Sequence, residues 1–201
     1  MSQNIPAATV AAAEQRNLGA HKATHLPERP AGDARRLDEF ERGIVAELNN
    51  GDLFAASWGK LHVYQLTDGR NLPRSHVFWL HEAGGGRVHL GDWPGDVRSL
   101  ILQGVWQVWV PWIVNQALEG KPYEFIVDAR KPKNNLGVRA EGLHIKGRVW
   151  PWTTIRSIEF TAGMFYVKVN GKLSPLAYNI GGVPNAHVLL AASQALHAQA
   201  S

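Results

Sequence analysis

Hydrophobic and polar positions alternate through residues 136–185. The alternation falls into short runs, and a period of two is typical of half-buried strands. The next residues place Val188, Leu189, Ala192 and Leu196 on one helical face. The pattern predicts a small antiparallel sheet that one amphipathic helix closes. Dipeptides that contain glycine separate the runs and supply the positive φ of tight turns: Glu141-Gly142, Lys146-Gly147, Ala162-Gly163 and Asn170-Gly171.

Residues 53–93 predict a second set of strands, with turns at residues 67–70 and 82–87. Residues 97–118 then predict a helix in which every third position is an indole, at Trp106, Trp109 and Trp112. Such a row drifts around the helix axis, so the three indoles cannot share one narrow core stripe. Either the helix packs between two sheets, or an indole faces a partner. Pro111 predicts a kink or a break, because proline lacks the amide hydrogen.

The first 50 residues carry weaker patterns. Residues 1–35 contain prolines, many alanines and no sustained apolar period, which predicts a disordered tail. Residues 36–50 predict an amphipathic helix, because Leu37, Phe40, Ile44 and Leu48 share one stripe. It could dock on the first sheet, on a partner or on a membrane surface. Its opposite face is acidic, which argues against an anionic bilayer, so we expect it to dock on the protein itself.

These patterns together predict an α+β chain with two small antiparallel β domains, each closed by a helix. The disordered tail takes residues 1–35 and the amphipathic helix takes residues 36–50. The first β domain, with the Trp-rich helix, takes residues 51–120. The second β domain takes residues 121–198.

One run of residues matches a known pattern. Gly142 and Leu143 precede Pro151, Trp152 and Ile155, and the segment Val-Pro-Asn at residues 183–185 leads into the last helix. The run resembles bacterial PH-like domains, in particular an uncharacterised bacterial family with two such halves. The resemblance lies mainly over residues 122–198. It implies that the second domain is PH-like, that Gly142 turns a hairpin, and that residues 51–120 form a degenerate first half. It implies a binding fold, often oligomeric, and no reaction.

The amino-acid composition excludes several kinds of functional site. The chain has 201 residues, 8 Trp and no Cys, which excludes disulfides, thiolate nucleophiles and zinc held by cysteine. The N-terminus lacks a basic cluster followed by an apolar core of signal-peptide length, so we expect a cytoplasmic protein. Arg98, Gln103, Gln107 and Asn115 interrupt the longest apolar stretch, so we expect no transmembrane segment.

Positive charge is concentrated in the second domain. Residues 121–172 hold ten basic and four acidic residues, a net charge of +6, whereas the whole chain carries +4. The candidate ligand-binding residues are Arg130, Lys131, Lys133, Arg139, Lys146 and Arg148. By resemblance, the loop at residues 128–135 joins the first two strands of a PH-like domain, where lipid-binding members gather Lys and Arg. Such a cluster can bind an anionic phospholipid surface or nucleic acid. The alternative is a solvated hairpin loop.

Other candidate sites lack complete motifs. His76, His81 and His89 do not form a zincin motif, so no metal site is predicted. The glycines before Arg87 lie in a predicted hairpin, where a phosphate loop needs a strand leading into a helix. No serine lies in a GxSxG elbow. We therefore expect no enzyme activity and no cofactor.

The sequence favours a non-catalytic binding or scaffolding protein that acts through its PH-like domain. The expected partner is another protein or a second copy of the chain, with Trp106, Trp109 and Trp112 as the interaction surface. The alternative is an anionic phospholipid surface or nucleic acid bound by residues 130–148. Aromatics interleaved with basic residues, such as Trp150 beside Arg148, also leave single-stranded nucleic acid open.

Overall fold

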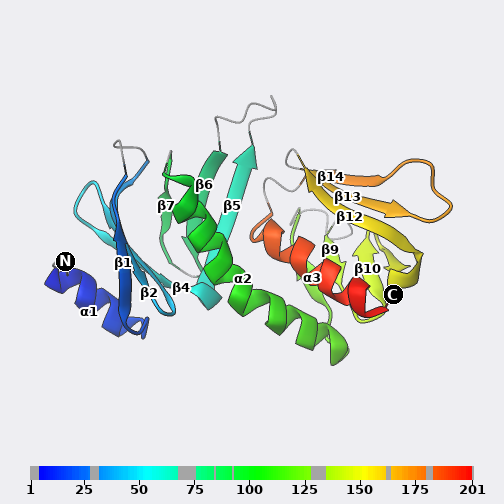
Figure 1. Ribbon diagram of the computed structural model, residues 1–201, viewed down its shortest axis with the longest axis horizontal. Helices are drawn as coiled ribbons and strands as arrows, with labels where there is room; N and C mark the ends of the chain where they lie inside the picture. The colour runs from blue at the N-terminus through cyan, green and yellow to red at the C-terminus, as the bar shows by residue number, and fades with distance from the viewer. Residues whose placement is uncertain are drawn as a thin grey trace. The chain divides into compact units, whose positions relative to one another are not determined.

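The computed structural model describes residues 5–27, 32–67, 76–83, 85–91, 93–127, 135–161, 164–179 and 183–200 (Figure 1). It contains helices and antiparallel sheets, which confirms the α+β class. The chain divides into two compact units. Unit 1 comprises Met1–Val63 and Pro73–Val105, and unit 2 comprises Tyr64–Leu72 and Trp106–Ser201.

The strands that precede α2 form one four-stranded and one three-stranded sheet, and they belong to unit 1 except for the end of β5, which belongs to unit 2. The first sheet is a meander of β1, β2, β3 and β4, and the second has the order β5-β6-β7. A one-turn 3-10 helix, Trp58–Lys60, separates the two sheets along the chain. The helix α2 follows the last strand. The bounds are β1 His21–His25, β2 Ala34–Phe40, β3 Gly43–Leu48, β4 Leu53–Ser57, β5 Leu61–Thr67, β6 His76–Glu82, β7 Arg87–His89 and α2 Gly95–Leu118.

Unit 2 has the same order of elements. A four-stranded sheet, β11-β10-β9-β8, is followed by a 3-10 turn at Trp152–Thr154 and a three-stranded sheet, β12-β13-β14. The closing helix α3 packs against β12 and the 3-10 turn. The bounds are β8 Tyr123–Phe125, β9 Leu136–Val138, β10 Gly142–Ile145, β11 Arg148–Pro151, β12 Ile155–Thr161, β13 Met164–Val169, β14 Leu176–Asn179 and α3 Ala186–Ala200.

A glycine holds the same place in both units. Gly43 pairs with Ser57, directly before Trp58, and Gly142 pairs with Pro151, directly before Trp152. A Cβ on Gly43 would lie 2.2 Å from the Ala56 carbonyl oxygen, and one on Gly142 would lie 2.1 Å from the Trp150 carbonyl oxygen. Only glycine allows backbones to approach so closely. Gly142 therefore begins β10 and permits close pairing, whereas the resemblance implied that it turns a hairpin.

The turn signals of the C-terminal sheet have mixed outcomes. Lys146 and Gly147 both have positive φ, as does Gly171, which confirms the turns at Lys146-Gly147 and Asn170-Gly171. The signal at residues 162–163 lies outside the described residues. The predicted closing helix is confirmed, because α3 buries Val188, Leu189, Ala192 and Leu196.

The predicted helix over residues 36–50 is wrong, because β2 and β3 occupy this segment and pair as a hairpin. Both faces of the hairpin are covered, so Leu37 and Asp38 are both buried although they point to opposite sides. Apolar positions on two strands and their turn then produced a spacing that resembles a helical stripe. The run Ile44-Val45-Ala46, buried at every position, is typical of a strand covered on both faces.

The predicted disorder of residues 1–35 is wrong for the part of this range that the structure describes. The helix α1, Ala7–Gln15, packs on β3 and β4, and its residue Ala13 joins a core cluster with Phe40 and Val45. The side chain of Arg16, the residue that follows the helix, donates hydrogen bonds to the buried carboxylate of Glu82, one of them 2.9 Å long. An alanine-rich helix has little pattern of its own, and such a helix depends on tertiary packing.

The predicted Trp-rich helix is confirmed as α2, which is not split in two although Pro111 lies inside it. Its core residues Val97, Ile101 and Val105 are buried in unit 1, and Ile113 and Ala117 are buried in unit 2. None of the helices in the described part of the chain combines the length and hydrophobicity that crossing a bilayer requires.

Candidate functional site: an exposed aromatic patch

Aromatic side chains of unit 2 gather on the second half of α2 and on β8. Trp109 contacts Trp112 edge to face at 5.7 Å between ring centroids, and Tyr123 lies 5.9 Å from Trp109 and 5.5 Å from Trp112. Tyr123 in turn contacts the buried ring of Phe125 at 4.9 Å. The edge-to-face geometry lets each ring brace the next. The cluster therefore has a fixed base in the core of unit 2.

Trp112 of this cluster faces solvent, as does Trp106, which lies earlier on α2. Trp106 is 44% exposed and Trp112 is 47% exposed, whereas Trp109 and Tyr123 are half-buried. Val108 is exposed and lies one helical turn before Trp112. Burial raises the pKa of the Tyr123 phenol, so this ring stays neutral at physiological pH. We call Trp106, Val108, Trp109, Trp112 and Tyr123 the aromatic patch.

The part of the aromatic patch that lies on α2 belongs to a segment without charged residues. No charged residue occurs between Arg98 and Glu119. Leu118 at the end of α2 and Ile126 just after β8 are also exposed. Five of the eight exposed large hydrophobic side chains among the described residues thus fall within residues 106–126. The sequence pointed to the three tryptophans but missed Val108, Leu118, Tyr123 and Ile126, because their exposure depends on which face of unit 2 is covered.

The basic residues that the sequence pointed to differ in their surroundings in the structure. Arg130, Lys131 and Lys133 lie outside the described residues. Arg139 is half-buried, and its backbone carbonyl accepts a hydrogen bond of 3.1 Å from the Trp152 indole. Its Nε is buried without a hydrogen-bond partner in the described part of the chain. Arg139 thus sits within the fold of unit 2.

Lys146 and Arg148 join a second cluster, which we call the cation–ring cluster: Lys146, Arg148, Trp150, Lys172 and Tyr178. The Arg148 guanidinium lies 4.1 Å from the centroid of the Trp150 ring, and the Lys172 ammonium lies 5.1 Å from it. The Lys146 ammonium lies 5.1 Å from the Tyr178 ring. Burial raises the pKa of Tyr178 to about 12, so this ring is neutral. Two exposed cations therefore lie near the Trp150 ring and a third lies near the Tyr178 ring, and cation–π attraction favours both arrangements.

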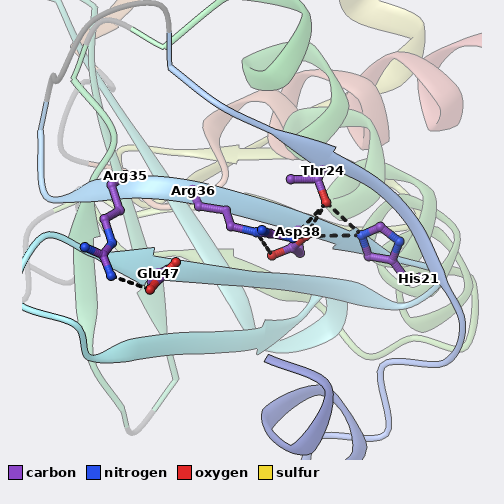
Figure 2. Close-up of polar contacts among 6 residues, drawn as sticks. All are labelled: His21, Thr24, Arg35, Arg36, Asp38 and Glu47. Atoms are coloured by element: carbon purple, nitrogen blue, oxygen red, sulfur yellow. Dashed lines mark hydrogen bonds and ion pairs between the residues drawn. The ribbon is translucent and has the colours of Figure 1, made fainter. Parts of the chain in front are cut away.

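A polar cluster on β1 and β2 lies in unit 1 (Figure 2). Arg36 binds the Asp38 carboxylate through two nitrogens, at 2.7 and 2.9 Å, and Thr24 donates its hydroxyl to the same carboxylate. His21 Nε2 lies 3.2 Å from Asp38 Oδ1. Burial alone would raise the pKa of the Asp38 carboxyl, but the hydrogen bonds from Arg36 and Thr24 outweigh burial and lower it. The cluster holds one buried carboxylate in its charged form.

This polar cluster does not have the geometry of a nucleophilic relay. In a Ser-His-Asp relay, one imidazole nitrogen contacts the nucleophile and the other contacts the acid. Here the same atom, His21 Nε2, contacts both Thr24 Oγ1, at 3.2 Å, and Asp38. The cluster therefore positions the strands and does not activate Thr24.

The histidines of the β6–β7 hairpin do not form a metal site in the part that is described. The side chain of His76 lies outside the described residues. The His89 ring stacks on Trp79 at 4.8 Å, and Arg87 lies 5.3 Å from the Trp79 ring. Burial and the nearby Arg87 charge lower the pKa of His81. A cation at this place repels a metal ion, and the described residues contain no group of three or more His, Asp or Glu that could hold one.

Comparisons of the chain with protein-family models, with curated proteins and with solved structures find no match.

Proposed function

We propose that the protein is a non-catalytic binding protein built from two PH-like units, and that it docks a protein through the aromatic patch. Two features support PH-like units. The order of sheets, Trp-containing turn and closing helix is the same in both units. Gly43 and Gly142 occupy equivalent places in the two units, because each pairs with the residue directly before that turn. The scaffold alone does not specify a function, so the proposed binding role depends on the site that the scaffold carries.

The observation that carries this proposal is the exposure of Trp112 on a braced aromatic cluster, together with the exposure of Trp106 on the same helix. Large rings dominate the energetics of protein interfaces, because they bury much area and lose little conformational freedom. A contiguous exposed apolar patch on a folded protein is typical of an interaction site.

Photo-crosslinking in the cells that make the protein tests this function. With a benzoylphenylalanine residue in place of Trp106, we expect crosslinked adducts of the chain with a neighbouring molecule. Protease digestion should remove these adducts, because the neighbouring molecule is a protein. The same residue in place of Leu173 is the matched control, since Leu173 is fully exposed in unit 2 and lies outside the aromatic patch. Mass spectrometry of the adducts identifies the neighbour.

Adducts at position 106 that exceed those at position 173 support docking through the aromatic patch. Equal yields at the two positions, or adducts made only of lipid or nucleic acid, would contradict the proposed function.

The cation–ring cluster supports a second candidate function, binding of an anionic ligand such as a phospholipid surface or nucleic acid. Arg148 and Lys172 flank an indole that can also stack on a nucleic-acid base. No acidic side chain of the described residues forms an ion pair with Lys146, Arg148 or Lys172. These cations therefore remain available for phosphate groups.

Co-sedimentation with anionic vesicles, and competition by short single-stranded DNA, test the second candidate. The variant Arg148→Glu with Lys172→Glu is expected to weaken binding at least about tenfold and to flatten its salt dependence, because phosphate contacts release counterions. The control is Lys168→Glu, whose native lysine is exposed but already paired with Glu159 at 2.7 Å. A similar loss in the variant and the control, after allowing for their different charge changes, would count against a specific anion site.

A further inference from the structure

The connection between β13 and β14 contains one of the two Asn-Gly pairs in the sequence, Asn170 and Gly171, and the other pair is Asn50 and Gly51 between β3 and β4. In such a pair the glycine nitrogen can attack the asparagine side-chain amide, because glycine has no Cβ to obstruct the approach. All four residues are exposed, and both glycines have positive φ, +76° at Gly171 and +89° at Gly51. A Cβ would meet open space at either glycine, so crowding does not distinguish the two pairs.

Hydrogen bonds hold both reacting groups of the Asn50 pair. The Gly51 amide donates to the Leu48 carbonyl oxygen at 3.0 Å. The Asn50 side chain is held at both ends, since its Nδ2 donates to Asp52 Oδ2 at 2.7 Å and its Oδ1 accepts from the Asp52 amide at 3.0 Å. An attack by the Gly51 nitrogen has to break these bonds, and their loss adds to the barrier of the reaction.

The reacting groups of the Asn170 pair are not held in this way, although the backbone on either side of them is. The Asn170 amide donates to the Thr154 carbonyl oxygen at 2.8 Å. The Lys172 amide donates to the Val169 carbonyl oxygen at 3.1 Å, which closes a four-residue turn. Between these two bonds, neither the Gly171 nitrogen nor the Asn170 side chain forms a hydrogen bond with the residues that the structure describes.

We propose that Asn170 is a site of spontaneous deamidation, a covalent modification of the chain that needs no enzyme and no cofactor. The Gly171 nitrogen loses its proton and forms a bond to Asn170 Cγ. The bond from Cγ to Nδ2 breaks, ammonia leaves with that proton, and a succinimide ring closes. Water then opens the ring at either carbonyl, which gives aspartate or isoaspartate. The net reaction consumes one water molecule and releases one ammonia molecule.

The place of this turn gives the modification a consequence for the cation–ring cluster. Lys172 follows two residues after Asn170, and its ammonium lies 5.1 Å from the Trp150 ring. Either product carries a carboxylate, so the modification adds a negative charge close to this cation in the sequence. Isoaspartate also adds one methylene to the main chain of the turn that presents Lys172. The modification thus changes both the charge and the backbone at the edge of the cation–ring cluster.

Peptide mapping by mass spectrometry tests the site, on the purified full chain sampled during incubation at mildly alkaline pH. Trypsin cuts after Arg42, Lys60, Lys168 and Lys172, so the two Asn-Gly pairs lie in different peptides. In the folded chain we expect the acid form to accumulate at least about tenfold faster at position 170 than at position 50, because hydrogen bonds restrain only the Asn50 pair. In urea the turns are lost, and the two rates should become similar.

The variant Asn170→Gln is the matched control. Glutamine keeps the amide but is one methylene longer, so we expect no acid form to build up at position 170 and an unchanged rate at Asn50. Circular dichroism establishes that the variant is folded. A rate at Asn50 that equals or exceeds the rate at Asn170 in the folded wild-type chain would overturn the proposal, as would the absence of an acid form at position 170. The proposed function would survive either result, since it rests on the aromatic patch.

Discussion

Replacing Arg36 with methionine is expected to lower the free energy of unfolding by about 3 kcal/mol at neutral pH. Arg36 supplies two of the hydrogen bonds that hold the Asp38 carboxylate, and this carboxylate is 1% exposed. Methionine keeps much of the apolar stem but leaves a buried charge without its cation. Thr24 and His21 still contact Asp38, which keeps the loss at the lower end of the range for a broken buried pair. Urea unfolding of the full chain measures the change.

The neighbouring Arg35→Met variant is the matched control. Arg35 pairs with Glu47, and both residues are drawn in Figure 2. Unlike Asp38, this pair is accessible to solvent, since the Arg35 side chain is 56% exposed. An exposed pair contributes less than about 1 kcal/mol. Equal losses for the two arginines would contradict the role given to Asp38.

The Arg36 effect also has a pH dependence with a defined sign. The pKa of Asp38 is lowered from 3.8 in the folded chain, so its contribution to stability is present above pH 3.8 and is lost as the pH falls through the folded value. Without Arg36 the pKa of Asp38 is expected to rise, because burial raises it and the strongest opposing hydrogen bonds are lost. The difference in stability between wild type and variant should therefore shrink as the pH is lowered.

Replacing Gly142 with alanine is expected to lower the free energy of unfolding by about 3 kcal/mol, near the upper end for overpacked sites. The added Cβ would lie 2.1 Å from a backbone oxygen, that of Trp150, so the β10–β11 pair must move apart. Gly43→Ala is expected to have a similar effect in unit 1, because its Cβ would meet the carbonyl oxygen of Ala56. Urea unfolding followed by near-ultraviolet circular dichroism measures both losses.

Two other glycines provide controls for the Gly142 variant. Gly147 has a φ of +76° but open space around a Cβ, so Gly147→Ala should cost only the backbone strain of about 1 kcal/mol. Gly95 has open space and no positive φ, and Gly95→Ala should be close to neutral. A loss at Gly142 no larger than that at Gly147 would show that close approach of the backbones is not what requires glycine.

The sequence predicted the second half of the chain better than the first for a physical reason. In the C-terminal sheet one face is buried and the other faces solvent, so apolar and polar residues alternate in the sequence. This alternation is visible at β13, where Phe165 and Val167 are buried and Lys168 is exposed. In β2 and β3 both faces are covered, and the buried Asp38 and Glu39 look like surface residues in a sequence. Their partners, such as His21 and Lys22, come from β1, and only the folded sheet brings them close.

The candidate site was predictable in part. The three-residue spacing of the tryptophans indicated that they could not share one narrow core stripe, which left open a helix between two sheets or an indole that faces a partner. In the structure Trp106 and Trp112 are exposed. The spacing did not reveal Tyr123, which joins the cluster from the next strand. In the same way Lys146 and Arg148 were visible as basic residues, whereas the contribution of Lys172 depends on a later hairpin that brings it to Trp150.

Hydroxyl-radical footprinting of the tryptophans tests the docking role of the aromatic patch most directly. In a dilute solution of the purified chain, Trp106 and Trp112 should be oxidised fast, and the buried Trp58, Trp93 and Trp152 should be protected. In the cells that make the protein, Trp106 and Trp112 should become protected because a protein covers them. Oxidation of Trp106 and Trp112 at the same rate in dilute solution and in cells would contradict the docking role of the aromatic patch.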